Sequence, residues 1–147
     1  MTTLGFMSAM EITASGLTAE RVRMNTLASN LANARTTRTE EGGPYRRTDP
    51  VFRAVAASER LGVGSDPHAR NVFLVEVPEV RQDTTPGPLV YDPSHPDANP
   101  EGYVEMPNVS VVTEMVNLVT ATRAYEAGIS MMDSVKTMAR SALSIGS

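Results

Sequence analysis

The sequence has no cysteine and no tryptophan, and its 147 residues include only 3 Phe and 4 Tyr. Without cysteine the chain can form no disulfide bond, and no thiol can serve as a nucleophile or metal ligand. The shortage of aromatic side chains leaves any core poor in large anchors. The 9 Met, with many Ala, Ser and Thr, are instead typical of adaptable surfaces that approach one another closely.

Long apolar runs and basic clusters are also missing. No apolar run reaches the length that spans a membrane. The net charge of −4, with no basic cluster beyond Arg46–Arg47, argues against nucleic acid as a partner. The first basic residue is Arg21, so the N-terminus lacks the basic region of a conventional secretory signal.

The C-terminal third of the chain predicts one long helix. Apolar or small residues recur at alternating steps of three and four from Leu118 to Leu143. Pro107 and Asn108 interrupt the preceding segment, and Ser110 can cap the first turn. A second apolar row runs beside the first, so the apolar arc is wider than one buried face needs. We therefore expect this helix to be buried against several neighbours, mostly from other chains. The alternative is that it forms the central helix of an ordinary bundle.

The N-terminal segment Leu4–Ala34 predicts a second long helix. Met10, Leu17, Met24 and Leu31 follow a strict seven-residue repeat, which places them on one face with nearly the period of a coiled coil. The helix would be about 46 Å long, close to the roughly 50 Å expected for the C-terminal one. Two helices of matched length at opposite ends of the chain can pair antiparallel.

Asparagine near the end of the N-terminal helix suggests how that helix ends. Asn30 and Asn33 suit a fraying last turn, because Asn accepts the left-handed conformation that often closes helices.

The middle of the chain predicts short strands and loops. Gly42-Gly43-Pro44 indicates a turn followed by an extended segment, and residues 71–80 read as a strand ended by Pro78. Residues 88–107 read as a proline-rich loop bounded by a short strand.

The expected fold is therefore mainly α with a small β-rich insert. Residues 1–35 and 107–147 would form the terminal helical domain, coiled-coil-like with its helices antiparallel. Residues 36–106 would form a small β-rich middle domain with its loops.

A metal-binding module is one alternative. Asp92, His95, Asp97 and Glu101 offer oxygen and imidazole ligands within ten residues. The opening of an EF-hand loop is matched from Asp97, but its twelfth position is Asn where Glu is required, and Asp, Pro and Asn also dominate ordinary turns. The other histidine, His68, has no acid–base partner nearby in sequence. We expect no catalytic site, metal or cofactor.

Each end of the chain carries a longer motif. The first runs through SGLTAERVRMNTLASNLANARTT and the second through NVSVVTEMVNLVTATRAYEAGISMMDSVKTMARSAL. These two motifs resemble the axial proteins of the bacterial flagellum, the family of rod and hook subunits. The matching positions are Ser15, Gly16, Leu17, Asn25, Ala28, Asn30, Leu31, Ala32 and Asn33, and then Glu114, Met115, Arg123, Tyr125 and Glu126. The middle segments GGPYRR and DPSHPDANPEGYV resemble the proximal-rod members. The family usually has Asn where Gly128 stands.

The resemblance implies a structural subunit, not an enzyme. Such a subunit polymerises through its terminal helices into the proximal rod of the basal body, the helical drive shaft that carries torque from motor to hook. Its partners would be other copies of itself, proximal and distal rod proteins, the export-gate and ring adaptor, and the flagellar type III export apparatus. No nucleic acid, membrane span or small-molecule substrate is expected. The rod would lie within the periplasmic space, reached without a cleavable signal peptide.

Apolar residues of both helices are the expected subunit interface: Met10, Leu17, Met24, Leu27, Leu31, Met115, Leu118, Val119, Tyr125, Ile129, Met132 and Leu143. Phe6 and Met10 resemble an export-signal element, although two apolar residues four apart also suit plain core packing. If these apolar arcs become buried only on assembly, the terminal segments should be partly disordered in the monomer. A secreted coiled-coil effector or adhesin that shares only the helical ends is the remaining alternative.

Overall fold

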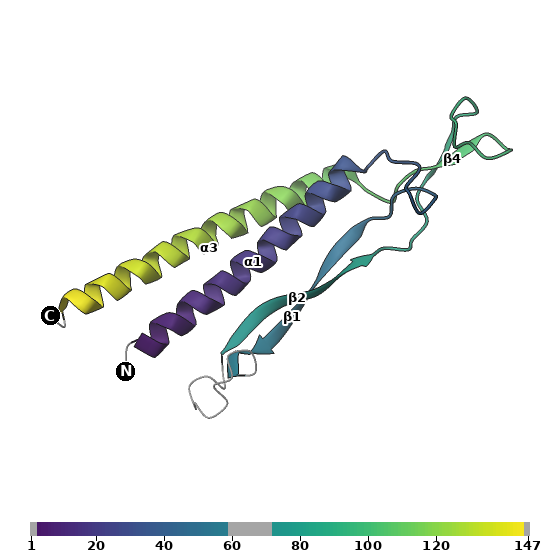
Figure 1. The fold of residues 1–147 in the computed structure, drawn as a ribbon. Helices are drawn as coiled ribbons and strands as arrows, with labels where there is room; N and C mark the ends of the chain where they lie inside the picture. The colour runs from purple at the N-terminus through teal and green to yellow at the C-terminus, as the bar shows by residue number, and fades with distance from the viewer. Residues whose placement is uncertain (1–2, 59–71, 146–147) are drawn as a thin grey trace. The chain divides into compact units, whose positions relative to one another are not determined.

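A computed structural model describes residues 3–58 and 72–145, with side chains described for 8–58 and 72–144 (Figure 1). The fold is mostly helical, with two long helices at the ends of the chain and two small sheets between them. In chain order the elements are α1 (Thr3–Ala32), β1 (Thr48–Ala56), β2 (Phe73–Gln82), β3 (Leu89–Tyr91), β4 (Tyr103–Glu105) and α3 (Val111–Ile145). This confirms the predicted fold class at the level of its elements.

Both helices lie close to their predicted positions. The helix α1 covers 30 residues and α3 covers 35, and neither is long and apolar enough to cross a membrane within the part of the chain that is described. Ser110 immediately precedes α3, and its side-chain oxygen accepts a hydrogen bond from the Thr113 hydroxyl at 2.9 Å. The Ser110 carbonyl accepts the first helical bond, from the Glu114 N–H at 2.9 Å.

The end of α1 differs from the prediction. No residue other than glycine has a positive φ among the described residues, so neither Asn30 nor Asn33 adopts the left-handed conformation. The Asn33 side chain instead donates to the Ser29 carbonyl at 3.0 Å, and the same carbonyl accepts the Asn33 backbone N–H at 3.1 Å. Asn30 does not lie in a frayed turn either, because it is fully buried.

The strand prediction was wrong about Pro78. The strand β2 continues through this residue to Gln82. Proline has no N–H to donate, but each strand of a two-stranded sheet has an unpaired edge that tolerates it. The proline-rich segment holds two strands rather than one, because β3 pairs antiparallel with β4 and Val90 lies opposite Val104.

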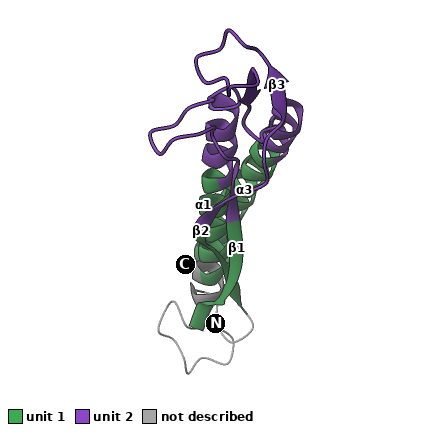
Figure 2. Ribbon diagram, turned by 90° about the vertical axis from the view of Figure 1, so that its right-hand side faces the viewer, with its two compact units in different colours: residues 1–22, 51–78, 121–147 green, residues 23–50, 79–120 purple. Residues whose placement is uncertain are grey.

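The chain forms two compact units (Figure 2). Unit 1 comprises residues 1–22, 51–78 and 121–147, and unit 2 comprises residues 23–50 and 79–120. Each unit therefore combines part of α1, part of the β-rich middle and part of α3. The division into a terminal and a middle domain stays a prediction.

Unit 1 has a core of small side chains. Ala19 of α1, Leu74 of β2 and Ala121 of α3 are buried, and Leu74 is the largest fully buried side chain among the described residues of this unit. A Cβ atom added to Gly128 would lie 2.7 Å from the Cδ2 atom of Leu17, so this glycine lets the leucine lie directly over α3.

Unit 2 has a partly polar core. Leu27 and Val104 are its buried large apolar side chains, at 3% and 2% exposure. Asn30 and Glu114 are buried completely, at 0% exposure each. A polar group in such a position is costly unless it is hydrogen-bonded, so these two side chains mark the centre of a polar network.

Candidate functional site

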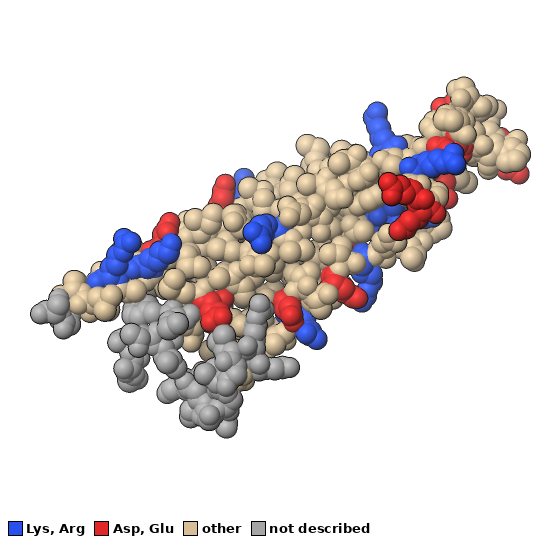
Figure 3. All heavy atoms as spheres, viewed as in Figure 1, with Lys and Arg blue, Asp and Glu red and all other residues tan. Residues whose placement is uncertain are grey.

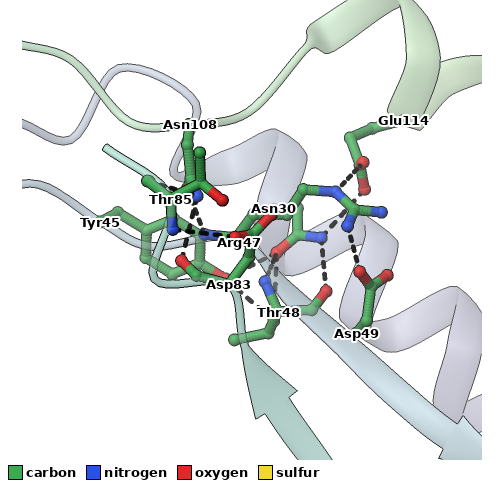
Figure 4. A network of polar contacts seen from close by, with 9 residues as sticks. All are labelled: Asn30, Tyr45, Arg47, Thr48, Asp49, Asp83, Thr85, Asn108 and Glu114. Atoms are coloured by element: carbon green, nitrogen blue, oxygen red, sulfur yellow. Dashed lines mark hydrogen bonds and ion pairs between the residues drawn. The ribbon is translucent and has the colours of Figure 1, made fainter. Parts of the chain in front are cut away.

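A network of polar contacts joins α1, the loop before β1, the segment after β2 and the start of α3 within unit 2 (Figure 4). We call it the polar cluster. Its members are Asn30, Tyr45, Arg47, Thr48, Asp49, Asp83, Thr85, Asn108 and Glu114.

Asn30 uses its whole hydrogen-bonding capacity inside the cluster. Its amide group donates to the Thr48 carbonyl and to Glu114 Oε2, both at 2.9 Å. Its side-chain oxygen accepts bonds from the Tyr45 hydroxyl at 2.9 Å and from the Thr48 N–H at 3.0 Å. A single buried side chain thus fixes the end of α1 against the first residue of β1 and against α3.

Glu114 is the charged partner in this network. Its Oε1 atom accepts a 2.6 Å hydrogen bond from Arg47 Nε, and Arg47 also pairs with Asp49. Burial lowers the pKa of Arg47, but its hydrogen bonds to Glu114 and Asp49 outweigh that effect and raise the pKa above its ordinary value. The guanidinium therefore stays charged and neutralises the buried carboxylate.

Backbone contacts extend the cluster to the loop after β2. The Arg47 N–H donates to Asn108 Oδ1 at 2.7 Å, and the Arg47 carbonyl accepts from the Asp83 N–H at 2.7 Å. The Asn108 amide bonds the carbonyls of Asp83 and Thr85, each at 3.0 Å. Hydrogen bonds from Thr85 hold the pKa of Asp83 below its usual range.

The chemistry of the cluster is structural. The buried side chains of Asn30 and Glu114 already bond their neighbours, so their polar atoms are used within the fold. Buried polar networks of this kind are known to fix the register of packed helices. The arrangement is suited to holding four separate segments in one alignment.

The acidic loop between β3 and β4 was the candidate metal site. Asp92 accepts hydrogen bonds from Ser94, the ring of His95 accepts the Asp97 N–H at 3.1 Å, and Thr37 donates to Asp97 at 2.9 Å. Among residues 3–58 and 72–145, no three His, Asp or Glu side chains are arranged to hold a metal ion. Asp92 and His95 serve the turns of the loop itself, whereas Asp97 ties the loop to Thr37 and Arg38. The metal-binding alternative gains no support.

The remaining sequence candidates have separate outcomes. Both arginines of the Arg46–Arg47 pair form salt bridges, because Arg46 bonds Glu105 and the Thr85 carbonyl and Arg47 bonds Glu114. His68 and the side chain of Phe6 lie outside the described residues, so the export element stays a prediction.

The expected interface residues are placed unevenly. Leu27 is buried in the chain's own core, at 3% exposure. Those that are well exposed all belong to α3: Met115, Val119, Ile129 and Leu143. The others are half-buried: Met10, Leu17, Met24, Leu31, Leu118, Tyr125 and Met132. Their part in assembly stays a prediction.

The exposed apolar surface of α3 is concentrated near its start. Val112, Met115, Val116 and Val119 are 73%, 56%, 61% and 55% exposed. The only charged residue of this stretch, Glu114, is buried. Charged side chains are sparse over much of the surface drawn in Figure 3. A soluble monomer seldom leaves a continuous apolar row in water, so the row indicates a contact with another molecule.

Comparison with known proteins agrees with this picture. A family model described as "Flagella basal body rod protein" matches residues 10–38, and one described as "Flagellar basal body rod FlgEFG protein C-terminal" matches residues 101–145. "Flagellar basal-body rod protein FlgC" of Borreliella burgdorferi is 38% identical over 97% of this chain and 98% of its own length. The chain belongs to the FlgC family of flagellar basal-body rod proteins.

Other FlgC proteins are also similar to this chain over most of its length. That of Bacillus subtilis is 42% identical over 94% of this chain and 96% of its own length. That of Aquifex aeolicus is 45% identical over 83% of each chain. The chain is thus a structural subunit of the flagellar basal-body rod and not an enzyme.

Proposed function

We propose that this chain is a proximal-rod subunit that polymerises through its terminal helices into the shaft carrying torque from motor to hook. The observation that carries the proposal is the exposed apolar row on α3, from Val112 to Val119. Removing such surface from water contributes about 25 cal/mol per Å², before the cost of ordering the partners. Copies joined by contacts between unlike surfaces form an open helix, unless the rotation that relates each copy to the next closes them into a ring.

The proposed shaft requires that α1 and α3 pair antiparallel. Two contacts support this arrangement. Leu17 lies over Gly128 in unit 1, and Asn30 bonds Glu114 in unit 2. Moving forward along α1 from the first contact to the second means moving backward along α3.

Spin labels can test the pairing, because the chain has no cysteine of its own. Antiparallel helices bring labels at Ile12→Cys and Asp133→Cys close together. Labels at Ile12→Cys and Val112→Cys should then be farther apart by roughly 30 Å, since 21 helical residues separate the two α3 positions. The reverse order of distances would show parallel pairing.

The proposed partners are further copies of this chain and other rod components, with the rod placed in the periplasm. Isolated basal bodies provide the test. A strain whose only copy of the chain carries an epitope tag should yield rods labelled by the matching antibody below the hook. Rods that are complete but unlabelled, from cells that make the tagged chain, would contradict the proposal.

A further inference from the structure

An apolar ridge runs along the first turns of α3. It consists of Val112, Met115, Val116 and Val119, which fall within an arc of about 100° on a helix that turns 100° per residue. The buried Glu114 lies on the opposite side of the helix. The ridge therefore points away from the core of unit 2.

The ridge ends at a positive charge. Arg123 follows Val119 by one turn on the same face, is exposed, and has no ion-pair partner among the described residues. Beyond it this face becomes polar, with exposed Glu126, Ser130 and Asp133. The apolar row is thus a bounded patch with a cation at one end.

A groove of complementary character lies in unit 1, between α1 and β2. Its volume is about 310 Å³. Small and apolar side chains dominate its lining: Ala14, Ser15, Thr18, Ala19 and Val22 from α1, and Leu74, Val75 and Val77 from β2. Ser15 is fixed in the wall, because its hydroxyl accepts the Val75 N–H at 3.2 Å.

The groove also ends at a charge, of the opposite sign. Glu11 lies at the start of its α1 wall and has no ion-pair partner among the described residues. Glu76, the other carboxylate of the lining, already pairs with Arg53 at 2.8 Å. The wall from Glu11 to Val22 and the ridge from Val112 to Arg123 are each eleven helical steps long, about 16 Å.

We infer that the ridge of one copy docks into the groove of the next, with the two helices antiparallel and Arg123 paired with Glu11 of the neighbouring copy. In this alignment Val119 lies near Ser15, Val116 near Thr18, and Val112 near Val22. The small side chains of the α1 wall allow the aliphatic ridge to approach closely. Ridge and groove are different surfaces of one chain, so the contact is heterologous and can repeat without closing. This inference rests on the proposed rod function and names the surfaces that carry it.

Charge reversal tests the pair directly. In sedimentation velocity on the purified full chain, Arg123→Glu or Glu11→Arg alone should weaken self-association roughly tenfold, because like charges then meet across the contact. Both changes in one chain should restore association to near the wild-type level. Lys136→Glu reverses a charge on α3 away from the ridge and should have little effect.

Cysteine cross-linking tests the register without changing charge. Chains carrying Thr18→Cys, mixed with tagged chains carrying Val116→Cys, should form a mixed disulfide on oxidation. The matched mixture of Thr18→Cys with Lys136→Cys should not.

Several results would overturn the docking inference while leaving the rod function in place. One is self-association of the wild-type chain that Arg123→Glu and Glu11→Arg weaken no more than Lys136→Glu does. Another is swimming lost in the Arg123→Glu strain although self-association is unchanged, which would mean that the ridge meets a different rod component. Failure of the rod function itself looks different: cells without the gene would build complete rods.

Discussion

The side-chain amide of Asn30 donates a 2.9 Å hydrogen bond to the carboxylate of Glu114, 84 residues further along the chain, and both side chains are completely buried. The bond joins the last turns of α1 to the first turn of α3. Two buried polar groups satisfy each other only in one alignment, whereas apolar groups tolerate sliding. The pair therefore fixes the register of the two terminal helices within unit 2.

Removing the Glu114 carboxylate should destabilise unit 2 strongly. Glu114→Ala removes one of the two acceptors of the Asn30 amide, leaving only the Thr48 carbonyl, and leaves the partly buried Arg47 paired only with Asp49. The loss should be about 3 kcal/mol. Urea unfolding of the purified chain measures the effect. Glu126→Ala, an exposed site on the same helix, should stay within about 0.5 kcal/mol of wild type. Equal losses at the two sites would contradict the role of the cluster.

Enlarging Gly128 should displace Leu17. The Cβ atom of any larger residue would lie 2.7 Å from Leu17 Cδ2, so Gly128→Leu should destabilise unit 1 by about 1–3 kcal/mol through overpacking. Adding Leu17→Ala should recover part of that loss, and thermal unfolding of the single and double variants gives the coupling.

Gly16 provides the control, because a Cβ atom there has nothing within 4 Å. Gly16→Ala should stabilise α1 by up to about 1 kcal/mol, the usual gain in a helix interior.

For the Leu17–Gly128 contact, the contradicting result is additivity. Additive effects of Leu17→Ala and Gly128→Leu on the free energy of unfolding would show that the two residues do not share a contact.

Gly87 should tolerate no side chain. A Cβ atom there would lie 1.8 Å from the backbone oxygen of Met106, and no rotamer change can relieve a clash with backbone. Gly87→Ala should therefore break the 2.9 Å bond from the Met106 N–H to the Pro88 carbonyl and cost about 3 kcal/mol in urea unfolding. Pro86→Ala, at an exposed neighbour, should cost less than about 1 kcal/mol. Similar losses for both variants would refute this close approach.

Ser94 should control the acid titration of Asp92. The Ser94 hydroxyl donates to Asp92 at 2.6 Å and lowers the pKa of that carboxyl in the folded chain. Because the pKa of Asp92 is lower in the folded chain than the 3.8 of the unfolded chain, the ionised carboxylate stabilises the fold at pH values above 3.8. This stabilisation is lost as the pH falls through the folded-state pKa. In Ser94→Ala the Asp92 pKa should rise toward its ordinary value, as read by carboxyl carbon NMR. Asp83, held low by Thr85, is the internal reference and should not move.

The two helices could be predicted from sequence because their apolar periodicity and the break at Pro107 are local signals. The polar cluster around Asn30 and Glu114 could not be predicted from local signals. Asparagine near a helix end is usually a solvated closing residue, and its burial depends on Thr48 and Glu114, which are distant in sequence. The prediction that the strand ends at Pro78 was wrong for a related reason. The effect of a proline on a strand depends on which edge of that strand is paired, and the local sequence does not show this.

The apolar arc of α3 was predicted to be wider than one buried face needs. In the structure the row from Val112 to Val119 stops at Arg123, and exposed apolar side chains recur farther along the helix at Ile129, Met131, Met138 and Leu143. Helical periodicity alone could not show this limit. It identifies apolar faces without showing which one the chain covers itself, and here Leu17 covers α3 at Gly128.

Electron cryotomography of motors in cells lacking this gene, beside a complemented strain, tests the central claim most directly. The account predicts motors that stop at the inner-membrane ring, with neither rod nor hook, and rods restored by complementation. Complete rods and filaments in the deletion strain would contradict it.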